Sequence, residues 1–290
     1  MVPLEAVSQS HRVLAVVSPA QESNWLKREV RSLMSRIGIG QGAAMSRWAR
    51  NHDVTLFRAA SGRDCELSDR LKKLAPDVIC VSAFPWLLSD EILGTARQSA
   101  LNVHSSLLPR HRGPNPFLWI YYHDDRRTGV TVHRMNQRAD AGEILAQEAF
   151  DLPRGFAVDR LYAKKAELGA RLLVQVLDKL ETGDLKPRAQ DERFLTYAPR
   201  VSQGTKMVDW EWDVERVWHF LAGLCPRRRE PLRDAQQREV RYHSVLSYTL
   251  GDCPCEAGEL RPASFGWNLH CRGGSIQLGD ASHPRQGAEI

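Results

Sequence analysis

The sequence predicts an α/β fold, with an open parallel sheet in the larger part of the chain and a smaller β-rich C-terminal domain. Two observations lead to this prediction. Up to about residue 183, short apolar runs alternate with segments whose apolar residues recur at helical spacing, which is typical of parallel sheets with crossover helices. After about residue 207 the apolar runs are short and separated by Gly, Pro and Cys, which favours a small β domain.

The first hundred residues alternate predicted strands with predicted helices. We expect strands over residues 11–20, 53–59, 77–84 and 100–104, and helices over 42–52, 65–74 and 89–97. Residues 24–38 form either a helix or a basic loop. The run "DVICVSAF" is apolar throughout, which is typical of a central parallel strand. Ligands of open α/β sheets bind outside the carboxyl ends of strands, where "VSAFPWLL" and "NVHSSLLP" both lie.

The later elements are predicted in the same way. We expect a strand over 128–135 with its hairpin mate over 144–152, then an amphipathic helix from 158 that ends at Gly183. The segment 184–206 is polar and dotted with proline, as linkers are. In the tail we expect a helix over 209–223 and short strands over 239–249, 258–264, 267–274 and 275–279. The predicted division is a catalytic domain over 1–190, a linker over 191–206 and the β-rich domain over 207–290.

Composition restricts the cellular setting. A 42% apolar and 26% charged composition is ordinary for a globular protein, and no apolar run reaches the roughly 18 residues that span a bilayer. The N-terminal residues lack the pattern of a secretory signal, so we expect a cytoplasmic protein. The net charge of +5 permits a polyanionic partner without requiring one. The basic cluster Arg227, Arg228, Arg229 and Arg233 is either a solvated loop or a contact for RNA or an anionic substrate.

The cysteines indicate no disulfide framework. Six are scattered along the chain, and only Cys253 and Cys255 are close, in a C-P-C spacing unlike the usual zinc-site pairs. We therefore expect reduced thiols. His104, His111, His123 and His133 likewise show no recognisable metal-ligand spacing, so no metal is expected.

Two polar residues at the end of a predicted strand suggest chemistry. Residues two apart in a strand point to the same face, so Asn102 and His104 should project together while Val103 is buried opposite. An amide can donate a hydrogen bond to a developing oxyanion, and an imidazole can move a proton near neutral pH. Asp140, in a loop followed by small residues, is the candidate carboxylate to orient the imidazole. Neither Asn nor His is a strong nucleophile, so the pair suits direct attack by a substrate amine on a carbonyl.

These residues carry a family resemblance. The pattern "NVHSSLLPRHRG…P…W…D…TGVTVHRM…DAGEIL", over residues 102–145, resembles the signature of folate-dependent formyltransferases, and weaker similarity runs from about residue 13 to 250. The resemblance implies a Rossmann-like parallel-sheet domain that passes the formyl group of 10-formyltetrahydrofolate to a primary amine. By that likeness, Asn102 and protonated His104 stabilise the tetrahedral oxyanion and Asp140 steadies the imidazole, while the amine proton leaves through Asp140 or water.

The resemblance also implies where the substrates bind. The pterin of the donor would lie in a slot between "AFPWLLS" and the loop leading to Asp140; the alternative for the apolar members is plain core packing. The expected cofactor-binding residues are Phe84, Trp86, Leu87, Leu88, Asn136 and Ala139. A rigid loop from Pro109 to Pro116 would form the rim of the site. The expected substrate-binding residues are Ser106, Arg110 and Arg112, with His111 on the same rim; the alternative for Arg110 and His111 is a solvated loop.

The chain departs from the family pattern in two places. Only eleven residues precede "RVLAVV", so one βα unit is missing or rebuilt and the edge of the sheet is in doubt. Where relatives have a Trp-Pro-Gly-Ala-like turn, this chain has "PRRREPLRD". We therefore favour N-formylation of a small molecule, such as an amino sugar or an amino-acid-like or natural-product amine. Formylation of methionyl-tRNA is the second hypothesis, and a non-catalytic folate- or ligand-binding relative is the third.

Overall fold

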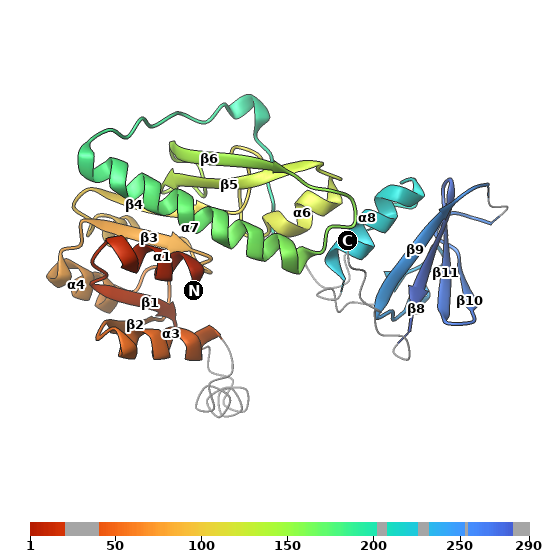
Figure 1. Ribbon diagram of the computed structural model, residues 1–290, viewed down its shortest axis with the longest axis horizontal. Helices are drawn as coiled ribbons and strands as arrows, with labels where there is room; N and C mark the ends of the chain where they lie inside the picture. The colour runs from red at the N-terminus through yellow and green to blue at the C-terminus, as the bar shows by residue number, and fades with distance from the viewer. Residues whose placement is uncertain (21–40, 202–207, 226–231, 253–254, 281–290) are drawn as a thin grey trace. The chain divides into compact units, whose positions relative to one another are not determined.

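The computed structural model describes residues 1–20, 41–201, 208–225, 232–252 and 255–280 (Figure 1). Within these ranges, no helix combines the length and the apolar character needed to cross a membrane. The chain forms two compact units. Unit 1 comprises residues 1–114, 129–148 and 165–197, and unit 2 comprises 115–128, 149–164 and 198–290. These units interleave along the chain, in contrast to the sequential division 1–190, 191–206 and 207–290, which stays a prediction.

Unit 1 begins with a small parallel pair of strands. Strand β1 (Ala15–Pro19) pairs with β2 (Thr55–Ala59), and helices α1 (Val2–Ser10) and α3 (Gln41–Asn51) precede one strand each. Trp48 of α3 is buried with Val16 of β1, and Leu4 of α1 packs against the same cluster. Helix α1 was not predicted. The predicted helix or basic loop over 24–38 lies outside the described residues.

The next helix illustrates how local sequence sets an element's ends. Helix α4 (Cys65–Leu74) starts where the Asp64 side chain accepts a hydrogen bond from the Leu67 backbone N–H, which caps an otherwise unpaired donor. It ends at Ala75, whose φ of 46° is left-handed. Leu67 and Leu71 of α4 are buried with Ala59 of β2 and with Ile92 of the short helix α5 (Asp90–Leu93).

The second sheet of the α/β architecture carries the candidate site. Its strand order is β3 (Val78–Ser82), β4 (Ser99–His104), β5 (Arg127–Arg134) and β6 (Ile144–Asp151). Strands β3 and β4 are parallel, and β5 is antiparallel to β4. The prediction that residues 77–84 form a central strand was wrong in one respect. Strand β3 lies at the end of this order, and Cys80 and Ser82 are exposed.

Among the described residues, no backbone ladder joins β1 to β3, so the strands of the α/β architecture form two separate sheets. The interruption falls in the N-terminal part of the sheet, where the family resemblance left the edge in doubt.

Helix α7 (Val158–Thr182) covers one face of the second sheet (Figure 1). The contact is close at Gly169, where an added Cβ would lie 2.6 Å from a Val103 methyl carbon and 3.4 Å from one of Val130. Only a glycine lets the helix approach β4 and β5 this closely. Because Val103 is turned toward α7, its neighbours Asn102 and His104 are turned to the other face.

The chain after α7 returns to unit 1 rather than running freely. Arg188 forms a backbone bridge with Ile144, and Tyr197 forms one with Arg112. Between them lies the short 3-10 helix η1 (Glu192–Phe194). The beginning of the predicted linker therefore packs against the loop that contains Arg112, because backbone hydrogen bonds join the two segments.

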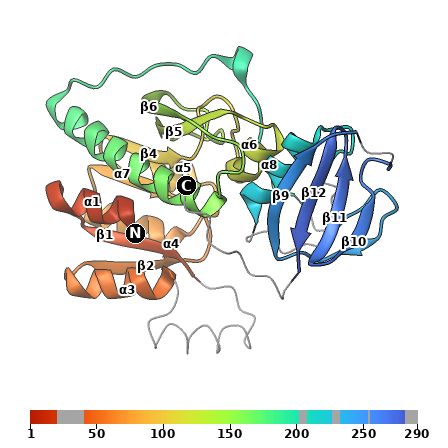
Figure 2. The ribbon, with the colours of Figure 1, turned by 45° about the vertical axis from the view of Figure 1, so that its right-hand side comes forward.

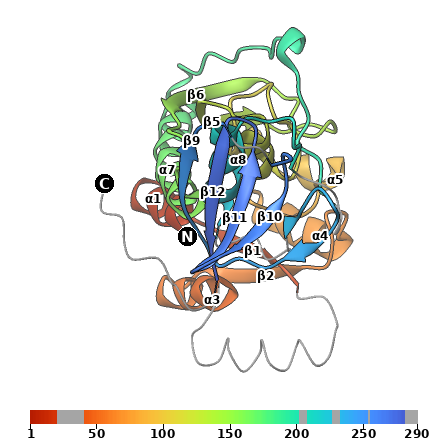
Figure 3. The same ribbon diagram turned by 90° about the vertical axis from the view of Figure 1, so that its right-hand side faces the viewer.

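Unit 2 holds the β-rich region (Figures 2 and 3). Helix α6 (Pro116–Tyr122) was not predicted, and α8 (Val214–Leu224) was. The main sheet is antiparallel in the order β10 (Leu260–Ala263), β11 (Gly266–Cys271), β12 (Gly274–Gly279) and β9 (Ser244–Leu250). A two-stranded ladder pairs β7 (Leu232–Arg233) with β8 (Glu239–Val240).

Some sequence predictions in unit 2 fall on residues whose structure is not described. Arg227, Arg228, Arg229 and Cys253 lie outside the described ranges. Arg233 is described and forms an ion pair with Glu239 at 2.7 Å. Among the described residues, Cys65, Cys80, Cys225, Cys255 and Cys271 form no disulfide bond, and the expectation of reduced thiols stays a prediction.

Candidate functional site

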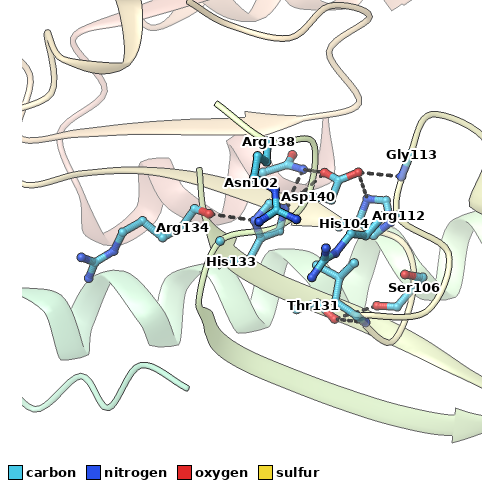
Figure 4. A network of polar contacts seen from close by, with 12 residues as sticks. Asn102, His104, Ser106, Arg112, Gly113, Thr131, His133, Arg134, Arg138 and Asp140 are labelled. Atoms are coloured by element: carbon cyan, nitrogen blue, oxygen red, sulfur yellow. Dashed lines mark hydrogen bonds and ion pairs between the residues drawn. The ribbon is translucent and has the colours of Figure 1, made fainter. Parts of the chain in front are cut away.

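Strand β4 delivers Asn102 and His104 to one face of the sheet (Figure 4). Asn102 lies opposite His133 of β5 in the antiparallel register, and His104 lies opposite Thr131. The Asp140 carboxylate lies beside both β4 residues. The structure therefore brings together Asn102, His104 and Asp140, as the sequence led us to expect.

His104 is held in one tautomer by its surroundings. The side chain is nearly fully buried, and Nε2 donates a hydrogen bond of 2.8 Å to the His111 carbonyl oxygen. Its Nδ1 faces an Asp140 carboxylate oxygen at 3.6 Å. Burial lowers the pKa of His104, although the Asp140 charge and the His111 carbonyl oppose this effect. In the neutral ring the proton is on Nε2, so the Nδ1 lone pair is the basic position.

Asp140 is the hub of the site. Its Oδ2 accepts a 2.8 Å hydrogen bond from the Gly113 backbone N–H, and its Oδ1 accepts one of 3.2 Å from the Asn102 amide. Burial alone would raise the pKa of Asp140, but the polar contacts with the His133 and His104 rings and the hydrogen bond from the Gly113 N–H outweigh burial and lower the pKa to about 2. Asp140 is thus a carboxylate at neutral pH, suited to stabilising a neighbouring positive charge.

His133 belongs to the site, although the sequence prediction considered it only as a metal ligand. It is 2% exposed, and its Nδ1 donates to the Arg134 carbonyl oxygen at 2.9 Å. Its Nε2 lies 3.1 Å from the Asn102 amide nitrogen and 3.4 Å from Asp140 Oδ1 (Figure 4). The sequence signal, a histidine in a predicted strand, does not reveal this proximity, because the cross-strand register is not readable from residues alone.

Arg112 is buried and contacts residues that hold the Asp140 loop. The side chain is 2% exposed and its guanidinium binds Gln190 and Glu192, the latter at 2.8 Å. Gln190 in turn donates to the carbonyl oxygens of Asp140 and Gly142 at 2.7 Å each. These partners compensate the desolvation of the buried guanidinium. Substrate binding by Arg112 stays a prediction.

The other expected substrate contacts lie in the turn after β4. Ser106 is fully buried and donates to the Arg110 carbonyl oxygen at 2.6 Å, which closes the turn. The Ser106 hydroxyl is therefore engaged within the turn, and substrate binding by Ser106 stays a prediction. Arg110 is exposed, and substrate binding by Arg110 stays a prediction.

The expected donor-binding residues divide into two groups. Phe84, Trp86 and Leu88 are half-buried and pack against the cluster around Ile92, as the core-packing alternative predicts, whereas Leu87 is 63% exposed. Asn136 lines a cavity of about 620 Å³, and Ala139 is exposed on the same loop. Their roles in donor binding stay predictions.

This cavity lies between α5, the start of β4 and the loop after β5. Its lining residues include Asp90, Ser99, Ala100, Arg134, Asn136 and Arg138. Ala100 is two residues before Asn102, and Arg138 is two residues before Asp140, so the lining approaches the polar cluster along both segments, although Asn102, His104 and Asp140 are not themselves lining residues. Its volume lies in the range of small-molecule sites, roughly 300–1,000 Å³. Across the described residues, no group of three His, Cys, Asp or Glu side chains is arranged to hold a metal ion.

Comparison with known proteins identifies similar chains. Residues 6–177 match the sequence model of the family described as "Formyl transferase". A methionyl-tRNA formyltransferase of Anaeromyxobacter dehalogenans (strain 2CP-C) is 37% identical over 183 residues, which cover 63% of this chain and 59% of that protein. This chain thus matches about three fifths of the length of that relative.

Two solved structures have a similar fold. The sugar 3N-formyl transferase WlaRD superposes with a TM-score of 0.70 at 12% identity, covering 98% of this chain and 94% of that chain. HypX from Aquifex aeolicus, in complex with tetrahydrofolic acid, superposes with a TM-score of 0.56 at 22% identity, covering 73% of this chain and 37% of that chain. At these identities the likeness concerns the fold alone.

Proposed function

This chain belongs to the formyl transferase family, and from that premise we propose that it transfers a formyl group from 10-formyltetrahydrofolate to the primary amine of a small molecule. The observation that carries the proposal is the convergence of Asn102, His104 and Asp140 beside a cavity of small-molecule size. An amide donor, an imidazole with a basic lone pair and an ionised carboxylate are the groups that aminolysis of a formamide requires.

The reaction can be written with its bonds and protons balanced. 10-Formyltetrahydrofolate supplies the formyl carbon and leaves as tetrahydrofolate. The acceptor nitrogen forms a bond to that carbon while the bond from the carbon to N10 of the folate breaks. The acceptor nitrogen loses one proton, which His104 Nδ1 takes up and returns to N10 as it leaves. No covalent bond to the protein is needed, in keeping with the absence of a nucleophile among these three residues.

Each residue has a distinct part in this scheme. The Asn102 amide donates a hydrogen bond to the oxygen on which negative charge develops. His104 starts neutral, because burial lowers its pKa, and becomes an imidazolium when it accepts the proton. Asp140, with its pKa lowered to about 2, is ionised throughout and stabilises that imidazolium across 3.6 Å. This scheme refines the expectation of a protonated His104: the resting ring is the base.

The cavity suits the donor's pterin. Its lining includes the loop 134–138 together with Asp90 and Ser99, which offer hydrogen-bond donors and acceptors. A pterin is a flat ring with hydrogen-bond donors and acceptors along one edge, which such a lining can bind. Because the lining residues Ala100 and Arg138 precede Asn102 and Asp140 by two positions each, N10 and the formyl group of a donor bound there would lie toward the polar cluster.

The acceptor is proposed to be a small amine. In support, the fold similarity to the sugar 3N-formyl transferase WlaRD extends over 98% of this chain, including the β-rich region. Methionyl-tRNA is the second candidate. It is favoured by the 37% identity to a methionyl-tRNA formyltransferase, a match that covers 63% of this chain.

The proposal is tested by incubating the protein with 10-formyltetrahydrofolate and a panel of amines. The panel includes nucleotide-linked amino sugars, amino acids and methionyl-tRNA, and mass spectrometry detects the gain of one formyl group. We expect formylation of a small amine, dependent on the donor and abolished in His104→Ala. Formylation of methionyl-tRNA alone would select the second candidate. Folate binding without transfer to any amine would favour the non-catalytic relative and contradict the proposal.

A further inference from the structure

His133 makes contacts that the proposed reaction does not yet use. It is almost fully buried within the site, and its ring faces both the amide and the carboxylate (Figure 4). Its Nδ1 lies 2.9 Å from the Arg134 carbonyl oxygen, which can only accept, so Nδ1 carries the proton. The Nε2 of the neutral ring is then an acceptor, 3.1 Å from the Asn102 amide nitrogen.

The orientation of the Asn102 amide follows from these neighbours. Asp140 Oδ1 lies 3.2 Å from the amide nitrogen and is an acceptor, as is His133 Nε2. If the amide were turned around, its oxygen would face two acceptors and no donor. The nitrogen must therefore point toward this pair, and the amide cannot rotate without losing both contacts.

The geometry further decides how the two amide hydrogens are used. The distances from the amide nitrogen to the two acceptors are 3.1 and 3.2 Å, and the acceptors are 3.4 Å apart, so the three atoms form a nearly equilateral triangle. At the amide nitrogen, the angle between the directions to the two acceptors is much smaller than the angle between the two N–H bonds of a planar amide. One N–H therefore points between the acceptors, and the second N–H points away from both.

We propose that His133 is a positioning residue that, with Asp140, fixes one N–H of Asn102 and thereby aims the other at the oxygen that becomes negatively charged during formyl transfer. This inference rests on the proposed function, since the oxyanion arises only if formyl transfer occurs. Preorganised donors contribute because they need no rearrangement when charge develops. His133 itself touches no reacting atom in this account.

Two substitutions separate this role from simple packing. A Gln side chain places an amide oxygen near the position of Nε2, so His133→Gln keeps an acceptor for Asn102. An Asn side chain reaches only the position of Nδ1, so His133→Asn keeps the contact to Arg134 and loses the acceptor. In formyl-transfer assays we expect His133→Gln to keep a rate within a few-fold of wild type. His133→Asn should lose on the order of 10-fold or more in kcat with KM for the donor little changed, a smaller loss than the roughly 10²–10³-fold expected for deleting an oxyanion donor outright.

His52→Leu is the matched control. It removes an imidazole whose Nδ1 likewise bonds a backbone carbonyl, that of Trp48, and it lies beside helix α3, which carries no site residue. Its kcat should equal that of wild type. Circular dichroism checks that all variants fold.

An NMR measurement keeps this test separate from the proposed function. The Asn102 side-chain amide signals are identified by their loss in Asn102→Asp, and rotation of the amide is followed by exchange spectroscopy. We expect slow rotation in wild type and His133→Gln and faster rotation in His133→Asn. If no amine is formylated but this pattern holds, the proposed function fails while the anchoring of the amide stands. Equal rotation in both variants, or equal losses of kcat in both, would overturn the role of His133.

Discussion

Each of the two units buries a histidine beside an aspartate, and the proposed function assigns proton transfer to only one of these pairs. In unit 1, His104 Nε2 donates to a carbonyl oxygen, and Nδ1 faces the Asp140 carboxylate with no N–H of the described residues directed at it. In unit 2, His219 is fully buried and its Nδ1 already accepts a 2.9 Å hydrogen bond from the Gly155 backbone N–H.

Both neutral rings carry the proton on Nε2. They differ in the group that the Nδ1 lone pair faces. His219 Nε2 lies 3.8 Å from Asp124, while Asp124 is bound by Arg154 at 2.8 Å. Burial lowers the pKa of His219 to about 4, against the attraction of Asp124. A histidine whose lone pair is occupied by a backbone N–H is a structural residue, whereas one whose lone pair faces a carboxylate can act as a base.

The largest effect on kcat is expected when the carboxylate beside the catalytic histidine is removed. The same substitution in unit 2 serves as the comparison. Asp140→Asn should lower kcat on the order of 10³–10⁴-fold, as loss of a histidine-orienting aspartate does, because the imidazolium loses its stabilising charge. Asp124→Asn in unit 2 should leave kcat within a few-fold of wild type and lower the melting temperature by a few degrees. Steady-state kinetics and thermal melts measure both. Equal kinetic losses in the two variants would erase the distinction.

Asn102→Ala comes next. Loss of the oxyanion donor should cost on the order of 10²–10³ in kcat with KM for the donor little changed, since the bond strengthens only in the transition state. The control is Asn268→Ala in strand β11 of unit 2, which should keep the wild-type rate. An increase in KM alone would instead make Asn102 a binding residue.

The fold was largely predictable because most elements have a strong local signal. Helix α7 and strands β4 and β5 were predicted from periodicity alone. Helix α6 was missed because its sequence, "PFLWIYY", is apolar on all sides and begins at Pro116, which reads as the end of a loop. A proline at the first turn of a helix loses no hydrogen bond, so the signal is ambiguous.

The site was predictable only in part. Asn102 and His104 share a strand face at a spacing of two, which sequence reveals, while Asp140 was a candidate from its loop with small neighbours and the family resemblance strengthened it. The contacts of His133 and Gln190 depend on cross-strand register and on the return of the chain after α7, neither of which leaves a local pattern. Arg112 was expected to contact a substrate because it is part of the family's Arg-Gly pattern, and the sequence did not show that its guanidinium is buried with Gln190 and Glu192.

The two units also differ in their response to acid. His219 has a pKa of about 4 against an ordinary value of 6.5, so it favours the folded state above pH 6.5, and this stability is lost between pH 6.5 and 4. The loss is about 3 kcal/mol. The lowered pKa of Asp140 stabilises the folded state at pH values above 3.8, the ordinary pKa of the group. This contribution to stability, about 2 kcal/mol, is lost as the pH falls through about 2. Denaturant unfolding of wild type and His219→Gln at several pH values should give a flatter profile for the variant between pH 4 and 6.5. Identical profiles would contradict the assignment to His219.

The smallest effect is expected at the support of the Asp140 loop. Gln190→Ala removes the hydrogen bonds to the carbonyl oxygens of Asp140 and Gly142 and leaves Arg112 with Glu192 as partner. A slightly misplaced carboxylate should lower kcat on the order of 10-fold. Gln277→Ala in strand β12 is the control and should match wild type. A wild-type rate for Gln190→Ala would show that the loop keeps its position without this support.

The most direct measurement is the single-turnover rate of formyl transfer by His104→Ala beside that of His219→Ala, both at saturating donor and acceptor and below their melting temperatures. The account predicts a loss on the order of 10²–10⁴-fold for His104→Ala, because a positioned proton acceptor disappears, and a rate within a few-fold of wild type for His219→Ala. A His104→Ala enzyme that turns over as fast as wild type would contradict the account.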